Sequence, residues 1–108
     1  MSVPEITVDE LATRLAAPGA ALFDVRQPDE YRAGHVPSAV LVPLNELADR
    51  VAEFPTDGDV LVICRSGARS SMACEFLAQH GRNALNVAGG MLAWVESGRD
   101  VSSGDSPS

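Results

Sequence analysis

Cysteine and histidine are scarce in this sequence. Its 108 residues include two cysteines, Cys64 and Cys74, and two histidines. A small secreted domain stabilised by disulfides needs more cysteines than this, and these few residues do not have the spacing of zinc ligands. We therefore expect free thiols and no metal site, so that each cysteine serves either packing or reactivity.

Basic residues are in short supply as well. Eight lysine and arginine residues stand against fifteen aspartate and glutamate residues, which gives a formal net charge of -7 at pH 7. Nonspecific binding to nucleic acid depends on a surplus of clustered basic side chains. We therefore expect no nucleic-acid partner.

Long apolar segments are missing too. The longest apolar runs, such as Val60–Ile63, are far too short to span a bilayer. The first eleven residues lack the basic stretch and the apolar core of a signal peptide. The expectation is a protein of the cytoplasm that does not enter a membrane.

What the sequence does contain is the composition of an ordinary globular domain, 45% hydrophobic and 21% charged. Its length favours a single domain with one core, which we place at residues 1–100. After Arg99 the chain becomes polar, and Val101 is its one apolar side chain. Such a segment gains too little from burial to offset the entropy lost on ordering. Residues 101–108 are therefore predicted to form a flexible C-terminal tail.

Short apolar runs and helical patterns alternate along the chain. Apolar runs bounded by Gly, Asp or Pro are typical of strands that are buried on both faces of a parallel sheet. A capping box, Thr7 with Glu10, marks the start of the first helix. The alternation indicates an α/β domain. Strands are predicted at Ala21–Val25, Val40–Val42, Val60–Cys64 and Leu85–Val87, and helices at Val8–Ala17, Asp29–Ala33, Leu44–Glu53, Ser71–His80 and Met91–Ser97.

The most informative segment follows the strand that ends at Cys64. The residues after it, Arg65-Ser66-Gly67-Ala68-Arg69, form a polar turn that leads into a helix. The turn contains no proline, so every backbone N–H can donate, and Gly67 permits backbone angles that are closed to other residues. These amides, the amino end of the helix with Ser70 or Ser71 as N-cap, and the two arginines together form a cradle for one anion.

A cysteine in such a cradle should be reactive. Thiols at helix N-termini beside cations have pKa values of roughly 3.5–7.5, below the ordinary value near 8.5. Cys64 is therefore predicted to be largely thiolate at neutral pH. Because the same cradle suits a persulfide, thiosulfate or phosphate, electrostatics alone does not select the reaction.

Four segments of the chain resemble the signatures of the rhodanese family. The loop Cys64-Arg-Ser-Gly-Ala-Arg69 is similar to the six-residue active-site loop of rhodanese domains. Two upstream segments, residues 23–31 and 34–39, and one downstream segment, residues 87–94, agree with it in order and spacing. The resemblance covers about residues 5–101 and has one departure, Ser38, where the family commonly has glycine.

The resemblance implies an α/β fold with a central parallel sheet flanked by helices, and a sulfurtransferase that needs no cofactor. In that chemistry Cys64 carries sulfur as a persulfide from thiosulfate or another persulfide donor to cyanide, a thiol or a protein acceptor. Arg65, Ser66, Gly67, Ala68 and Arg69 would bind the substrate. Arg65 favours thiosulfate, because family members that use thiosulfate tend to have a basic residue directly after the cysteine.

Several other polar residues have alternative interpretations. Arg69 either binds substrate or braces the loop by pairing with an acid. Asp24 and Arg26 lie at the end of the predicted strand Ala21–Val25 and are possible supporting residues. Asp24 is expected to brace the loop, and Arg26 either binds the donor or forms an ion pair. His35 is expected to hold a turn rather than to act as a base.

Four residues are interpreted as structural. Cys74 should be a packing residue rather than a resolving thiol. The pair Gly89-Gly90 should form a tight turn at a helix start, and Trp94 should belong to the core.

Two rival functions remain open. Cysteine phosphatases and arsenate reductases also use a Cys…Arg loop at a helix N-terminus, although phosphatase loops place five residues between the two, and here there are four. The other rival is a noncatalytic interaction module related to rhodaneses, which retention of Cys64 argues against. The physiological donor and acceptor, the pathway and the oligomeric state are not encoded in any pattern of the sequence.

Overall fold

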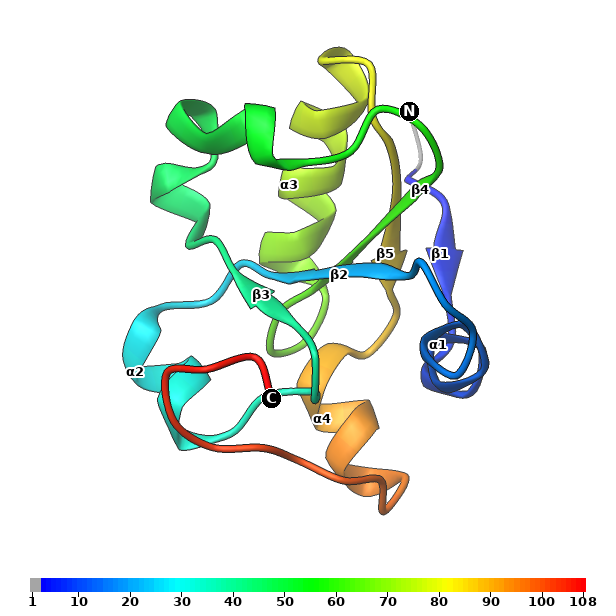
Figure 1. Ribbon diagram of the computed structural model, residues 1–108, viewed down its shortest axis with the longest axis vertical. Coiled ribbons are helices and arrows are strands. Elements are labelled where there is room, and N and C mark those ends of the chain that lie inside the picture. Colours follow the sequence, from blue (N-terminus) through cyan, green and yellow to red (C-terminus); the bar gives the residue numbers. More distant parts are fainter. Residues whose placement is uncertain (1–2) are drawn as a thin grey trace.

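Five short parallel strands form the centre of the molecule (Figure 1). The computed structural model describes residues 3–108. The strands lie in the order β1-β5-β4-β2-β3, and every neighbouring pair is parallel. Their bounds are β1 Glu5–Ile6, β2 Ala21–Asp24, β3 Val40–Leu41, β4 Asp59–Ile63 and β5 Asn83–Val87. The predicted α/β fold with a central parallel sheet is confirmed.

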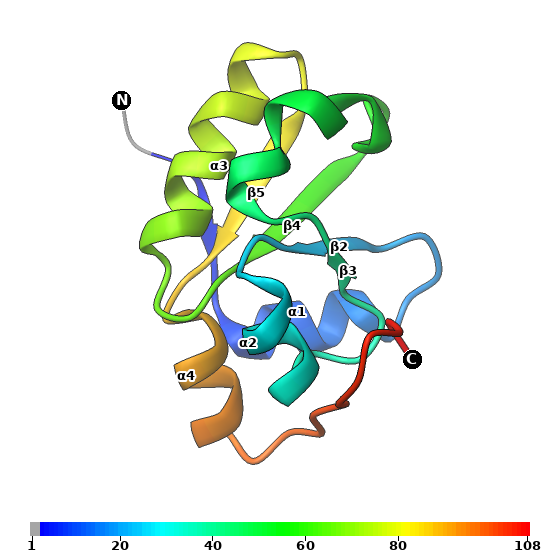
Figure 2. The same cartoon turned by 90° about the vertical axis from the view of Figure 1, so that its left-hand side faces the viewer.

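Helices cover both faces of this sheet (Figure 2). One face packs against α3 and two 3₁₀ helices, and the other packs against α1, α2 and α4. The α-helices are α1 Val8–Leu15, α2 Pro28–Ala33, α3 Ala68–Gln79 and α4 Gly90–Glu96, and the 3₁₀ helices are η1 Leu44–Glu46 and η2 Ala48–Glu53. Among the described residues, no helix is both long enough and apolar enough to cross a bilayer.

Strand β4 divides the core into two clusters. Its side chains alternate between the two faces, so Val60 and Val62 pack on the α3 side while Leu61 and Ile63 pack on the α1 side. Continuing the alternation, Cys64 points to the α3 side and is 1% exposed. The period of the central strand therefore determines on which face of the sheet the thiol lies.

Two predicted helices differ from those observed, and one observed strand was not predicted. The segment predicted as one helix from Leu44 to Glu53 forms the two 3₁₀ helices η1 and η2, and η2 is itself kinked at Arg50, whose backbone angles are not helical. The helix predicted from Ser71 begins at Ala68, because Gly67 takes the N-cap position at a φ of 110°. Strand β1 was not predicted, since two residues paired at a sheet edge leave little pattern in the sequence.

Ser38, the departure from the family pattern, adopts a φ of 79°. Glycine reaches this left-handed region without penalty, whereas a side chain makes it less favourable. Among the described residues it is the one non-glycine residue with a positive φ. The family's preference for glycine here therefore has a backbone cause.

The C-terminal segment runs back along α2 and the loop that follows it (Figures 1 and 2). Ser102 and His35 exchange backbone hydrogen bonds of 2.8 and 2.9 Å, and the N–H of Gly104 donates to the carbonyl of Arg32. The side chains of this segment are nevertheless almost all exposed. Its flexibility stays a prediction.

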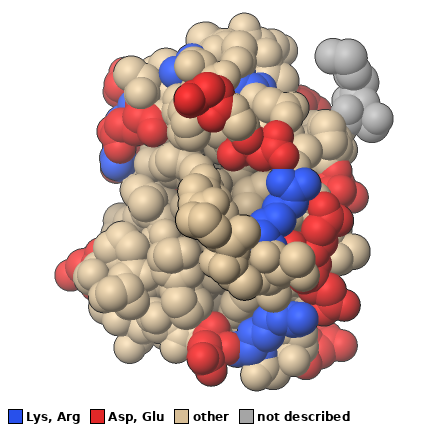
Figure 3. Space-filling view, turned by 45° about the vertical axis from the view of Figure 1, so that its right-hand side comes forward, with Lys and Arg blue, Asp and Glu red and all other residues tan. Residues whose placement is uncertain are grey.

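Acidic and basic side chains are interspersed on the surface. On the face shown in Figure 3, the blue basic side chains lie beside red acidic ones. Arg14 is an example, since its guanidinium lies 2.7 Å from Asp59 and 3.4 Å from Glu10. Surface arginines in such pairs do not form the clustered patch that binding to a polyanion requires.

Candidate active site

The loop after β4 turns around the sulfur of Cys64. The strand ends at Ile63, and α3 begins at Ala68, so the intervening residues form a tight connection between strand and helix. Gly67 provides the left-handed backbone conformation that this connection needs. As predicted from the sequence, the thiol lies at the carboxyl edge of the parallel sheet, where α/β proteins bind ligands.

Hydrogen-bond donors converge on the Cys64 sulfur. The backbone N–H of Gly67 lies 3.1 Å from Sγ, and the hydroxyl oxygen of Ser70 lies 3.3 Å from it. Burial alone would raise the pKa of the Cys64 thiol, but hydrogen bonds from the Ser70 hydroxyl and from the N–H groups of Ser70, Gly67 and Ser66 outweigh it. The net effect lowers the pKa, in the direction that the sequence predicted.

Helix α4 packs against the outer side of this loop. The N–H of Met91 donates to the carbonyl of Cys64 at 2.8 Å, and the N–H of Leu92 donates to that of Arg65 at 3.1 Å. A Cβ atom at Gly90 would collide with these two carbonyl oxygens. The glycine pair before α4 therefore both starts the helix, as predicted, and lets its first turn hold the active loop.

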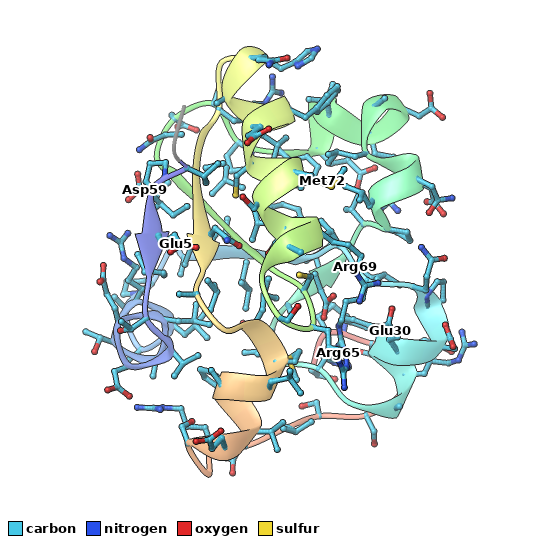
Figure 4. The ribbon with its side chains drawn as sticks, turned by 180° about the vertical axis from the view of Figure 1, so that it is seen from behind. Glu5, Glu30, Asp59, Arg65, Arg69 and Met72 are labelled. Atoms are coloured by element: carbon cyan, nitrogen blue, oxygen red, sulfur yellow. The ribbon has the colours of Figure 1, made fainter. Side chains whose placement is uncertain are left out.

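Arg69 is paired with an acid on the neighbouring helix α2. Its two terminal nitrogens lie 2.7 and 2.9 Å from the two carboxylate oxygens of Glu30 (Figure 4). This bidentate bond holds the pKa of Glu30 at about 2. Of the two roles considered for Arg69, the structure contains the brace, and its contribution to substrate binding stays a prediction.

Arg65 differs from Arg69 in having an unpaired guanidinium. Its side chain is exposed and makes no hydrogen bond or ion pair with any of residues 3–108. It borders a groove whose apolar wall includes the exposed side chains of Leu92, Val95 and Val101. A free cation at the rim of the thiol loop is available to an anionic substrate.

Asp24 and Arg26 form a buried pair beside the loop. The Arg26 guanidinium contacts both carboxylate oxygens of Asp24, with a closest distance of 2.8 Å, and donates to the carbonyl of Gly34 at 2.7 Å. These bonds connect the end of β2 to the end of α2 and do not reach the thiol. The structure thus contains the ion pair considered for Arg26, and the brace by Asp24 acts on α2 rather than on the active loop.

His35 and Cys74 are both buried, and among the described residues neither makes a hydrogen bond to the Cys64 sulfur. The His35 ring is fully buried, stacks on Tyr31 at a centroid distance of 3.7 Å and bonds the Tyr31 carbonyl through Nδ1. Burial raises the pKa of the Cys74 thiol to about 12. Trp94, also buried, packs in the core. These positions agree with the structural roles that the sequence indicated.

Sequence reasoning missed Asn86, which extends the polar contacts of the thiol. Asn86 lies on β5, is 1% exposed, and accepts a hydrogen bond from the Ser70 hydroxyl at 2.5 Å. Its amide nitrogen lies 3.2 Å from the Gly67 carbonyl and 3.1 Å from a carboxylate oxygen of Glu5. A polar residue inside the apolar run of a predicted buried strand was the signal that could have found it.

Side chains of the kinds that bind metals are scattered in the part of the chain that is described. Histidine, cysteine, aspartate and glutamate side chains of residues 3–108 do not gather into a group of three or more that could hold an ion. The chemistry available at this edge of the sheet is that of an activated thiol surrounded by hydrogen-bond donors.

Comparisons with known proteins agree with the resemblance found in the four sequence segments. The model of the rhodanese-like domain matches residues 7–97. A sulfurtransferase of Allochromatium vinosum is 42% identical over 92% of this chain and 94% of its own. A rhodanese-related protein of Thermoplasma volcanium aligns with a TM-score of 0.85 at 33% identity, over 92% of this chain and 97% of its own. A rhodanese-like domain protein of Staphylococcus aureus aligns with a TM-score of 0.81 at 34% identity, covering 85% and 91%. The chain therefore belongs to the rhodanese-like domain family.

Proposed function

We propose that this protein is a sulfurtransferase that carries sulfane sulfur as a persulfide on Cys64, with thiosulfate as one donor. The observation that carries the proposal is the convergence of the Gly67 N–H and the Ser70 hydroxyl on the Cys64 sulfur. Donors placed in advance around a sulfur stabilise negative charge on it without reorganisation during the reaction. The name of the Allochromatium relative supports the same class of reaction.

The reaction has two halves. In the first, the Cys64 thiolate attacks the outer sulfur of thiosulfate, a new S–S bond forms, and the old S–S bond breaks so that sulfite leaves with its electron pair. In the second, a thiolate or cyanide attacks the outer sulfur of the persulfide, and Cys64 leaves as a thiolate. The loop amides Ser66 and Gly67 stabilise anionic sulfur in both halves, with Ala68 starting the helix behind them.

Arg65 supplies the donor recognition in this scheme. Thiosulfate is a dianion, and the unpaired guanidinium at the rim of the loop can hold its sulfonate oxygens while the outer sulfur faces Cys64. Arg69 is less available to bind thiosulfate, because Glu30 already occupies both of its terminal nitrogens. The acceptor is cyanide, a small thiol or the thiol of a partner protein.

Mass spectrometry of the intact protein tests the covalent intermediate. After incubation with thiosulfate we expect one added sulfur, about 32 Da, and we expect Cys64→Ser to abolish it. Cys74→Ser is the matched control and should leave the adduct in place, since its thiol is buried and of high pKa. An adduct that survives Cys64→Ser, or that maps to Cys74, contradicts the proposal.

The phosphatase alternative is separated by a paired assay. Four residues between Cys64 and Arg69 form a cradle for one sulfur, which is too tight for three phosphoryl oxygens. We expect thiosulfate:cyanide sulfur transfer and negligible hydrolysis of p-nitrophenyl phosphate. Robust phosphatase turnover that is lost in Cys64→Ser, without any sulfur transfer, would replace the sulfurtransferase by the phosphatase.

A further inference from the structure

The Ser70 hydroxyl lies between two acceptors but carries a single hydrogen. Its oxygen is 2.5 Å from Oδ1 of Asn86 and 3.3 Å from Sγ of Cys64. All three residues are buried, at 0–1% exposure. Because these three side chains are buried, the hydrogens in the cluster come from the side chains and from the backbone N–H groups of the loop.

The orientation of the Asn86 amide follows from its other neighbours. Its nitrogen faces two atoms that can only accept, the Gly67 carbonyl oxygen and a carboxylate oxygen of Glu5. The amide oxygen therefore faces Ser70, and a carbonyl oxygen has no hydrogen to give. The hydrogen in the contact between Ser70 and Asn86 must belong to the Ser70 hydroxyl.

Two arrangements of that hydrogen are consistent with the distances. When Cys64 is a neutral thiol, its S–H can donate to Ser70 while Ser70 donates to Asn86, so that every donor is used. When Cys64 is a thiolate, it has no hydrogen, and a Ser70 hydroxyl that still donated to Asn86 would turn its lone pairs toward a negative sulfur. The hydroxyl must then rotate toward Sγ and leave the Asn86 oxygen without a donor.

We propose that Asn86 is a positioning residue that competes with ionised Cys64 for the Ser70 hydrogen and thereby limits how far Ser70 stabilises the thiolate. Glu5 takes part by holding the amide in the orientation that presents its oxygen. A thiolate that is stabilised less is a better nucleophile, because nucleophilicity falls as the pKa of a thiol falls. This consequence rests on the proposed sulfur transfer, whereas the competition itself does not.

The same competition favours the loaded state. Once a persulfide has formed, the negative charge lies on the outer sulfur and Sγ is bonded to two atoms. The Ser70 hydrogen then returns to Asn86, and the outer sulfur is left to the loop amides. Asn86 thus keeps the resting thiolate from being stabilised at the expense of the persulfide.

Other charged or titratable groups around Cys64 remain unchanged in the variants below that alter Asn86 or Ser70. These groups are Arg69 and Cys74 on α3, Glu5 on β1, Asp24 and Arg26 at the end of β2, and Arg65 in the loop. Helix α4 contacts the loop through the uncharged residues Met91 and Leu92.

The pH dependence of Cys64 alkylation tests the competition. Iodoacetamide reacts with the thiolate, and mapping the adduct by mass spectrometry separates Cys64 from Cys74. In Asn86→Leu, which has similar volume and no acceptor, we expect the Cys64 pKa to fall by about half a pH unit to one pH unit. In a Ser70→Ala background the same substitution should leave the pKa unchanged, because the shared hydrogen is gone.

Glu5→Ala provides a second variant that should fold, since Glu5 is an exposed residue. It loosens the Asn86 amide and also removes a negative charge, so the Cys64 pKa should fall further with Ser70 present than in a Ser70→Ala background, where only the loss of the charge acts. An equal shift in both backgrounds would mean that Asn86 acts through charge or packing, and a rise in the pKa would reverse the proposed role. Either result overturns the proposal.

A kinetic measurement connects the competition to sulfur transfer. The rate constant for loading of the Cys64 thiolate from thiosulfate should be about two- to threefold lower in Asn86→Leu, as the sensitivity of thiol nucleophilicity to pKa requires. Absence of any sulfur loading in the wild-type protein would refute the proposed function and leave the alkylation result standing. Loading that does not respond to a lowered Cys64 pKa would refute the consequence drawn for Asn86.

Discussion

At the scale of single residues, the reactivity of Cys64 is a balance between burial and hydrogen bonding. Burial disfavours the thiolate, and the donors from Ser70, Gly67 and Ser66 more than compensate. Because the folded pKa is lowered, the thiolate persists to lower pH than that of an ordinary cysteine. As the pH is lowered, the rate of sulfur loading should therefore decline only at a pH below the ordinary thiol pKa, rather than near that value.

Arg65 can be separated from the rest of the loop by substitution. If its unpaired guanidinium holds thiosulfate, Arg65→Ala should lower kcat/KM for thiosulfate about ten- to a hundredfold, or about 1.4–2.7 kcal/mol, and leave the fold intact. Arg32→Ala, which removes an exposed arginine from α2, is the matched control and should have no such effect. Equal losses with thiosulfate and with a neutral persulfide donor would show that Arg65 does not recognise the donor.

At the scale of secondary-structure elements, the active loop is held from two sides. Helix α4 holds it through the Met91 and Leu92 N–H groups, and α2 holds the first turn of α3 through the pair of Glu30 with Arg69. Both contacts join segments that are distant in the sequence. The loop therefore depends on packing between helices as well as on its own turn geometry.

The pair of Glu30 with Arg69 predicts a dependence of stability on acid. The folded pKa of Glu30 is about 2, below its ordinary value of 4.5, so the stabilisation is complete above the ordinary value and is lost as the pH falls toward 2. Since the pair is partly exposed, we expect Glu30→Gln to cost about 1 kcal/mol at pH 7 and progressively less as the pH falls below 4.5. Urea unfolding at a series of pH values measures this difference.

Glu75→Gln is the matched control for that series. Glu75 is an exposed carboxylate on α3 that forms no ion pair with the described residues. Glu75→Gln should change the free energy of unfolding only slightly, and by the same amount at every pH. If the cost of Glu30→Gln stayed the same from pH 7 to pH 3, the ion pair would not be the source of the effect.

At the scale of the whole molecule, the parallel sheet gathers the functional segments at one edge. Cys64 follows β4, the pair Asp24 and Arg26 lies at the end of β2, and α4 begins after β5. Parallel strands place all of their carboxyl ends on the same edge, so segments spaced along the chain meet there. The C-terminal segment is not positioned by a strand of the sheet, since it runs back along α2.

Two truncations test what that segment contributes. Removing residues 103–108 takes away the backbone hydrogen bonds of Gly104 with Arg32 and of Pro107 with Ser38, and because these residues are exposed and water can replace the bonds, it should cost no more than about 0.5 kcal/mol. Removing residues 101–108 also takes away Ser102, leaves the buried backbone of His35 unpaired, and should cost about 1–2 kcal/mol. Denaturant unfolding of both proteins measures the difference. Equal losses would place the contribution in the last six residues.

Much of this protein was determined by its sequence alone. The strand that ends at Cys64 and the proline-free turn with Gly67 could be read locally, because apolar runs, turn residues and backbone donors depend on neighbours in the chain. The resemblance of four segments to rhodaneses was equally a property of the sequence. So was the lowered pKa of Cys64, since its donors come from the six residues that follow it.

Only the tertiary structure decided which distant groups complete the site. Nothing near Arg69 in the chain indicates that Glu30 will neutralise it while Arg65 stays free, because that distinction arises from the packing of α2 against α3. Asn86 reaches Ser70 because β5 lies beside β4 in the sheet, and strand order is a property of the whole fold. Local patterns specify the reactive atom and its nearest donors, whereas contacts across helices and strands specify how strongly those donors are held.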